Sequence, residues 1–415
     1  MILLRSAAAA LAAASLAAAA APAQPGAQDR LFNDSGPLFD AAVGSDGAMT
    51  FQFFDEQVRF RLPPLPGSRE AELVAVLDKA SAGHVAVHIV YDAAGARFDS
   101  DSGRLVLPVC RLEAGGARFD AGSGCGTGIS AETGPSAALA RAYGYRQKED
   151  FPEAARILAT VADRGDSGLH KFVLWLRAST EEGWELLAPL GSEESDTHRV
   201  AALRAYRELA GLEPGEIAHQ FAIANLLTSL GAYGESEKIY GDMLREWPEE
   251  SFRIRLGQSA LARNQGHYSQ SLEILDALGR NPISPQSMRY HYHRAWTLSL
   301  LRRYDEAIAD LDAGLQIQAD YPSAFTRRGC ARAALGRLQE AIEDFDRSNA
   351  LLAALPGGAS SPAIRLDMDA VNSDRKQVAD AIAARRRTGI TGTCAGAYWR
   401  DWEQPRTRSR LLPAS

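Results

Sequence analysis

The chain has 415 residues and a formal net charge of −7 at pH 7, which allows two or three domains. A mildly acidic chain is not built to bind nucleic acid, because that function needs a surplus of basic residues. Its four cysteines are even in number, which suits two disulfide bonds in an exported protein.

Residues 1–23 have the pattern of a secretory signal peptide. Arg5 precedes a run rich in Ala and Leu, and Ala21-Pro22-Ala23 places small residues at positions −3 and −1 of a cleavage site. We expect cleavage after Ala23 and a periplasmic or secreted mature protein. A membrane anchor is the alternative, but an Ala-rich run this short spans a bilayer poorly. We therefore expect no stable membrane insertion after cleavage.

After the predicted signal peptide, a segment typical of loops precedes a segment with the patterns of strands and a helix. Residues 24–45 mix Gly, Asp, Ser and Pro without periodicity and predict a loose leader. Residues 46–120 predict a small α+β domain of unassigned topology, with a helix at 68–82. Three partly alternating segments are its expected strands: 50–62, 85–91 and 104–112.

Residues 121–136 predict a flexible linker rich in Gly and Ser. Within them, residues 122–128 read GSGCGTG, which superficially resembles a phosphate-binding loop. Such a loop requires Lys and then Ser or Thr after its last glycine, whereas Ile129 follows here. We therefore predict no nucleotide site in this segment.

A helical repeat returns every 34 to 36 residues between about 215 and 352. Its best copies are residues 290–317 and 324–352. Each has a small residue, Ala295 or Gly329, then nine residues later an apolar anchor, and soon after it Glu-Ala-Ile. A fixed period of this length predicts a stacked array of helix pairs, in which the small residues let paired helices approach closely.

This region resembles the tetratricopeptide repeat family over about residues 137–352, loosely before residue 215. The matching positions, copy by copy, are Ala224, Tyr233, Ser236 and Pro248; Ser259, Gly266, Tyr268, Ser271 and Pro282; Ala295, Leu298, Tyr304, Ala307 and Leu311; Gly329, Gly336, Leu338, Ala341 and Phe345. The resemblance implies a mainly α fold, a right-handed α-α solenoid that follows the α+β domain. Residues 353–388 are expected to cap it, and residues 389–415 form an aromatic and basic tail.

In the resembled family the first helix of each pair lines a concave, partner-binding face. Counting from the small residues places these side chains on that face: Phe221, Asn225, Arg253, Arg263, Arg289, Tyr292 and Trp296. Arg, Tyr and Trp make strong binding contacts, although Phe221 and Trp296 could instead pack between helices. The family's carboxylate clamp places Lys where Phe221 stands, so we do not expect capture of a C-terminal carboxylate.

Motifs for catalysis or metal binding are missing from the sequence. It contains no H-E-x-x-H, G-x-S-x-G or C-x-x-C, so we predict no catalytic residues, metal or cofactor. The leading hypothesis is a non-enzymatic exported adaptor that binds a protein or peptide partner and no nucleic acid. Two alternatives remain: an envelope enzyme with its site in residues 46–120 and repeats that recruit substrate, or a structural subunit of an envelope complex.

The cysteines predict two bridges. Cys110 and Cys125 have fourteen residues between them, and a bridge across so short a loop contributes roughly 3 kcal/mol in the chain-entropy model. The remaining pair, Cys330 and Cys394, would fold the tail back over the end of the solenoid. The alternative is that this second pair stays as free thiols.

Overall fold

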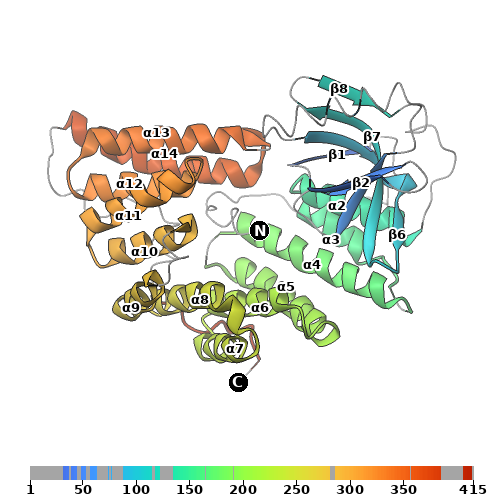
Figure 1. Cartoon of the computed structure of the whole chain (residues 1–415), viewed down its shortest axis with the longest axis horizontal. Coiled ribbons are helices and arrows are strands. Elements are labelled where there is room, and N and C mark those ends of the chain that lie inside the picture. Colours follow the sequence, from blue (N-terminus) through green and yellow to red (C-terminus); the bar gives the residue numbers. More distant parts are fainter. Residues whose placement is uncertain are drawn as a thin grey trace. The chain divides into compact units, whose positions relative to one another are not determined.

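The computed structural model describes residues 31–36, 39–43, 48–52, 57–62, 73, 76, 87–114, 117–121, 134–163, 165–189, 191–280, 286–355, 357–384 and 405–413. They fall into two compact units, which divide between Trp184 and Glu185 (Figure 1). The predicted signal peptide and most of the predicted linker lie outside the described residues.

The first unit contains a sheet whose described strands are β1 (Leu31–Gly36), β2 (Phe39–Val43), β3 (Met49–Gln52), β4 (Val58–Leu62), β5 (Val87–Asp92), β6 (Arg97–Asp99), β7 (Arg104–Ala114) and β8 (Ala117–Asp120). Its main order is β1-β5-β7-β4-β3-β2, and β6 and β8 also pair with β7. The expected strands correspond to β3, β4, β5 and β7. Residues 31–43, which we expected in a loose leader, form β1 and β2 instead, because β5 and β3 supply their hydrogen-bonding partners.

The long strand β7 organises this sheet. Its first half pairs in parallel with β4 and antiparallel with β6, and its second half pairs antiparallel with β5 and β8. Alternate residues such as Leu105, Leu107 and Val109 point into the core and are at most 1% exposed. Leu73 and Val76, from the predicted helix 68–82, are helical and join the same core.

Three helices complete the first unit: α2 (Pro135–Gln147), α3 (Phe151–Leu158) and most of α4 (Ser167–Leu187). Leu139, Ile157 and Phe172 belong to the hydrophobic core of the sheet. The sequence predicted that the repeat array would begin at residue 137. The structure assigns residues 137–184 to the sheet unit, because their apolar faces are buried against strands.

The second unit is helical. Its elements are α5 (Glu193–Leu212), α6 (Ile217–Ser229), α7 (Tyr233–Glu246), α8 (Ser251–Asn264), α9 (Tyr268–Gly279), α10 (Met288–Leu300), α11 (Tyr304–Ile317), α12 (Pro322–Ala334), α13 (Leu338–Ala354) and α14 (Pro362–Ala383). From α6 to α13 they form four antiparallel pairs that stack in chain order, from green to orange in Figure 1. In α14, Val371 and Val378 share a core with Phe345 of α13.

The predicted repeat register agrees with the packing. Ala224, Ser259 and Ala295 are each 0% exposed, and a Cβ atom on Gly329 would lie 3.0 Å from the ring of Phe345. The small residues therefore lie where paired helices touch.

The turn within each pair has one residue with a left-handed backbone. Gly231, Gly266 and Gly336 have φ values of 72°, 80° and 76°. The remaining pair uses Arg302, with φ of 59°, although residues with a Cβ atom disfavour this conformation. All four pairs thus have the same left-handed turn, including the pair that has Arg302 in place of glycine.

Buried hydroxyl pairs explain why Ser replaces Ala at two repeat positions. Ser236 lies 2.8 Å from the hydroxyl of Thr228 and donates to the carbonyl of Ala224 at 2.9 Å. Ser271 lies 3.0 Å from the hydroxyl of Thr297. Each buried hydroxyl therefore has a partner across a helix contact, which removes the penalty for burying it.

Candidate protein-binding surface

The first helices of successive pairs lie next to one another, since α8 contacts both α6 and α10, and α10 contacts α12. Together they carry a cluster that we call the A-helix face. It comprises Phe221, Arg253, Arg263, Arg289, Tyr292, His293, Trp296 and Arg327.

At the α6–α8 end of the A-helix face, Arg253 covers Phe221. Its guanidinium carbon lies 4.5 Å from the centre of the Phe221 ring, a distance at which the cation is attracted by the π-electrons. Arg253 also donates to Glu250 at 3.1 Å, yet 44% of its side chain remains exposed. Arg253 therefore combines a fixed position with access to a partner.

Trp296 of α10 is the centre of the face. The guanidinium carbons of Arg263 and Arg327 lie 4.0 Å and 4.2 Å from its ring centre. Both arginines are only 3% exposed. Desolvated contacts of this kind are worth about 2 kcal/mol each, so Trp296 holds two positive charges in place.

Burial, together with positive charge, lowers the pKa values of two side chains of this face. Burial, reinforced by the charges of Arg263, Arg289 and Arg327, lowers the pKa of His293 well below 6.5. Partial desolvation lowers the pKa of Arg289, and the charge of Arg253 lowers it further. The face is therefore an electropositive region of an acidic protein.

Two tyrosines support this region from α10 and the start of α12. Tyr292 lies 6.0 Å from Trp296 and 5.4 Å from Tyr321, measured between ring centres. Burial raises the pKa of Tyr321, so it stays neutral at physiological pH.

Three predicted residues have a different role from the one expected. Arg263 and Tyr292 are only 3% and 7% exposed, because each packs against an aromatic neighbour, so they shape the face instead of projecting from it. Asn225 accepts a 2.9 Å hydrogen bond from the hydroxyl of Tyr240. Of the predicted set, Arg253 and Arg289 are the exposed members, and Phe221 and Trp296 are half-buried.

Sequence reasoning missed His293 and Arg327. Both stand two residues before the small residue of their repeat, Ala295 or Gly329. The other two copies have Ala222 and Gly257 at this position, so comparing the copies gives no signal that would have identified them.

The described part of the chain offers neither a metal site nor a membrane-spanning helix. It contains no group of three or more His, Cys, Asp or Glu residues able to hold a metal ion. None of its described helices is both long and apolar enough to cross a membrane.

Comparison with known proteins identifies the repeats. The tetratricopeptide repeat pattern matches residues 289–321, which span α10, α11 and the turn into α12. The human RNA polymerase II-associated protein 3 is 31% identical over 87 residues, covering 20% of this chain and 12% of that protein. The human protein O-mannosyl-transferase TMTC1 is 25% identical over 169 residues, covering 40% and 19%. The chain thus spans less than a fifth of the length of these relatives.

Two solved structures of repeat proteins are similar to this chain over about half of its length. A tetratricopeptide repeat protein from Parabacteroides merdae is 17% identical, with 56% of this chain and 98% of that chain covered and a TM-score of 0.36. YrrB, a repeat protein described as having an unusual peptide-binding site, is 15% identical over 52% and 97% of the two chains, with a TM-score of 0.29. The tetratricopeptide repeat pattern therefore matches one helix pair of this chain and the turn after it, and the neighbouring pairs from α6 to α13 repeat the same helix pairing and register.

Proposed function

We propose that the chain is an exported adaptor that binds an acidic segment of a partner protein on the A-helix face, and that it acts by binding instead of by catalysis. The observation that carries this proposal is the arginine and aromatic cluster around Trp296. Arginine and aromatic side chains dominate the energetics of protein interfaces, and repeat arrays commonly bind extended segments on the face of their first helices.

The chemistry of the cluster selects the charge of the partner. Four arginines, Arg253, Arg263, Arg289 and Arg327, lie on one face, whereas the whole chain has a net charge of −7. Burial lowers the pKa of His293, and the charges of three of these arginines lower it further. Carboxylates of a partner would be attracted to this face and repelled by the rest of the surface, which directs the encounter.

The test uses two peptides of equal length, one rich in Glu and one rich in Lys, each with a fluorescent label. We expect the mature protein to bind the Glu-rich peptide and not the Lys-rich one, with an affinity that falls as salt rises. Arg253→Glu or Arg289→Glu should weaken binding by about tenfold, equivalent to about 1.4 kcal/mol.

Arg255→Glu is the matched control. Arg255 is exposed on the same helix as Arg253, but two residues further on it points to a different side of the helix. Equal loss of binding in Arg253→Glu and Arg255→Glu would mean that net charge, and not this face, is responsible.

Export is tested separately: the first residue of the protein recovered from the cell envelope should be Gln24.

A further inference from the structure

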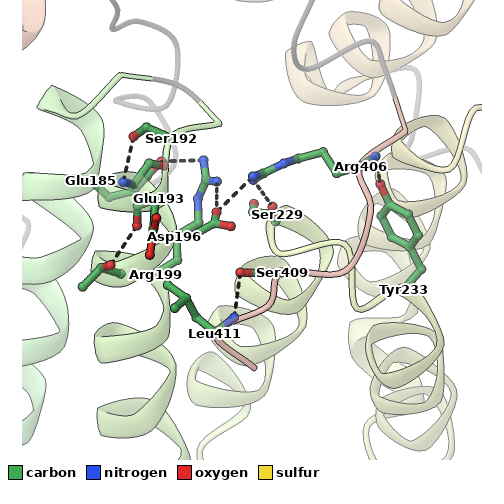
Figure 2. A network of polar contacts seen from close by, with 12 residues as sticks. Glu185, Ser192, Glu193, Asp196, Arg199, Ser229, Tyr233, Arg406, Ser409 and Leu411 are labelled. Atoms are coloured by element: carbon green, nitrogen blue, oxygen red, sulfur yellow. Dashed lines mark hydrogen bonds and ion pairs between the residues drawn. The ribbon is translucent and has the colours of Figure 1, made fainter. Parts of the chain in front are cut away.

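We call Pro405–Pro413 the C-terminal segment. It contacts Tyr233 and Asp196, which precede Arg406 by 173 and 210 positions in the sequence. The backbone N–H of Arg406 donates to the hydroxyl of Tyr233 at 2.7 Å. Its guanidinium donates through Nη2 to Asp196 at 3.0 Å and through Nη1 to the carbonyl of Ser229 at 2.6 Å. Figure 2 shows the Arg406 side chain reaching from the segment toward Asp196 of α5.

Two partly buried carboxylates lie next to the guanidinium of Arg406, and their negative charge needs compensation. Asp196 and Glu185 are two carboxylates whose side chains are 12% and 13% exposed, and Arg199 is bonded to both, at 3.1 Å and 2.6 Å. One arginine leaves this group with an excess negative charge. Arg406 supplies the second positive charge (Figure 2), and a partly buried carboxylate group strongly favours such compensation.

The backbone of the segment completes the end of α6. The last carbonyls of a helix have no partner within the helix. Here the carbonyl of Ser229 accepts from Arg406, and the carbonyl of Leu230 accepts from the N–H of Ser409 at 2.8 Å. The approach is close enough that a Cβ atom on Gly231 would lie 2.6 Å from the carbonyl oxygen of Thr407.

The rest of the segment adds one ion pair and one apolar contact. Arg408 donates to Glu235 of α7 at 2.5 Å, with both side chains about a third exposed. Leu412 is only 8% exposed. The segment thus presents arginines two residues apart to two carboxylates, in a conformation outside any helix or strand.

We propose that Asp196, Ser229, Leu230, Tyr233 and Glu235 form a second peptide site, the turn-edge site, which recognises an extended Arg-x-Arg segment. The chain's own C-terminal segment is its tethered occupant, and an Arg-x-Arg segment of another protein replaces it. This ligand is basic, so the turn-edge site is independent of the acidic segment proposed for the A-helix face. The segment belongs to the same chain and binds intramolecularly, so a free peptide competes poorly until the internal contacts are weakened.

The experiment uses the full chain and a fluorescent peptide with the sequence of residues 405–413, PRTRSRLLP. The protein variant Arg406→Ala/Arg408→Ala keeps the turn-edge site and weakens its internal occupant. We expect the peptide to bind this variant at least tenfold more tightly than the wild-type chain. A peptide with Ala in place of its first two arginines should bind neither. Adding Glu235→Gln to the variant should lower its affinity for the peptide, whereas Asp242→Asn, which removes an exposed carboxylate from the same helix, should not.

A second measurement needs no variant. Excess unlabelled PRTRSRLLP should speed hydrogen exchange of residues 405–413 in the wild-type chain, and the Ala-substituted peptide should not. Equal peptide affinity for wild type and variant, or equal effects of the two peptides on exchange, would overturn the proposal. A wild-type dimer that is lost in Arg406→Ala/Arg408→Ala would also overturn it, because the segment would then occupy a second copy.

Discussion

The guanidinium carbon of Arg263 lies 4.0 Å from the ring centre of Trp296, although the two residues come from neighbouring repeats. Arg263 is on α8 and Trp296 on α10, and both helices are the first of their pair. The contact therefore joins two repeats along the A-helix face and fixes the spacing between them.

Replacing the Trp296 ring tests how much this contact stabilises the array. Trp296→Leu removes the π-surface shared by two buried arginines, and we expect it to lower the free energy of unfolding by about 2–4 kcal/mol. Trp296→Phe keeps an aromatic face and should cost about half as much. Urea denaturation followed by circular dichroism measures both. Equal costs for the two variants would show that only ring volume matters.

The repeat register predicts the effect of overpacking. Ala295 is 0% exposed where α10 meets its neighbours, so Ala295→Leu should lower the free energy of unfolding by about 1–3 kcal/mol. Ala309→Leu, at an exposed position on α11, is the matched control and should change it little. An unchanged melting curve for Ala295→Leu would contradict the register.

The left-handed backbone of Arg302 predicts a stabilising change. Its φ of 59° costs a residue with a Cβ atom about 1 kcal/mol that glycine does not incur. Arg302→Gly should therefore raise the free energy of unfolding by about that amount, and Gly336→Ala should lower it at the equivalent turn. Thermal melts of the two variants should move in opposite directions.

The buried imidazole of His293 predicts a loss of stability in acid. Its pKa is lowered well below 6.5 in the folded protein, so the unfolded chain binds a proton there first as the pH falls. The corresponding stability is present above about pH 6.5 and is lost as the pH drops toward the folded pKa, by up to about 1.4 kcal/mol per pH unit.

The free energy of unfolding between pH 7 and pH 5 measures this slope. His293→Leu should make it shallower. His267→Asn, at an exposed histidine of the same unit, should leave it as in the wild type. Identical slopes in wild type and His293→Leu would assign the acid sensitivity to other groups.

The disulfide pairing is also testable. Cys110 and Cys330 are each in a disulfide bond, while Cys125 and Cys394 lie outside the described residues. We predict the pairs Cys110–Cys125 and Cys330–Cys394. Peptide mapping of unreduced, denatured protein should recover both linked peptides and no alkylated thiol. A linked peptide that joins Cys110 to Cys394 would refute this pairing.

The repeats could be predicted from the sequence because their rules are local. A small residue such as Gly329 and a turn glycine such as Gly336 recur at nearly constant spacing, and each has a single structural role. Arg302 breaks the turn pattern, yet the stacking of neighbouring pairs imposes the same backbone there. The positions of Phe221, Arg253 and Trp296 on the A-helix face follow from this register.

Contacts distant in sequence could not be predicted in this way. Strand β1 forms because β5 offers a partner more than fifty residues later, which no local pattern reveals. The helices α2 and α3 have a repeat-like pattern, but the sheet supplies the apolar surface that buries them. Likewise, the sequence around Asp196 does not indicate that its ion-pair partner is Arg406, which lies 210 positions away.

The long sequence separation between the turn-edge site and the C-terminal segment has a consequence during synthesis. Tyr233 and Arg406 are 173 positions apart, so at a rate of about 5–20 residues per second the ribosome adds Arg406 roughly 9–35 s after Tyr233. During that interval the carboxylates of Glu185 and Asp196 share the single cation of Arg199. A chain that has not yet reached Arg406 therefore holds Glu185 and Asp196 without the second guanidinium that compensates them in the folded protein.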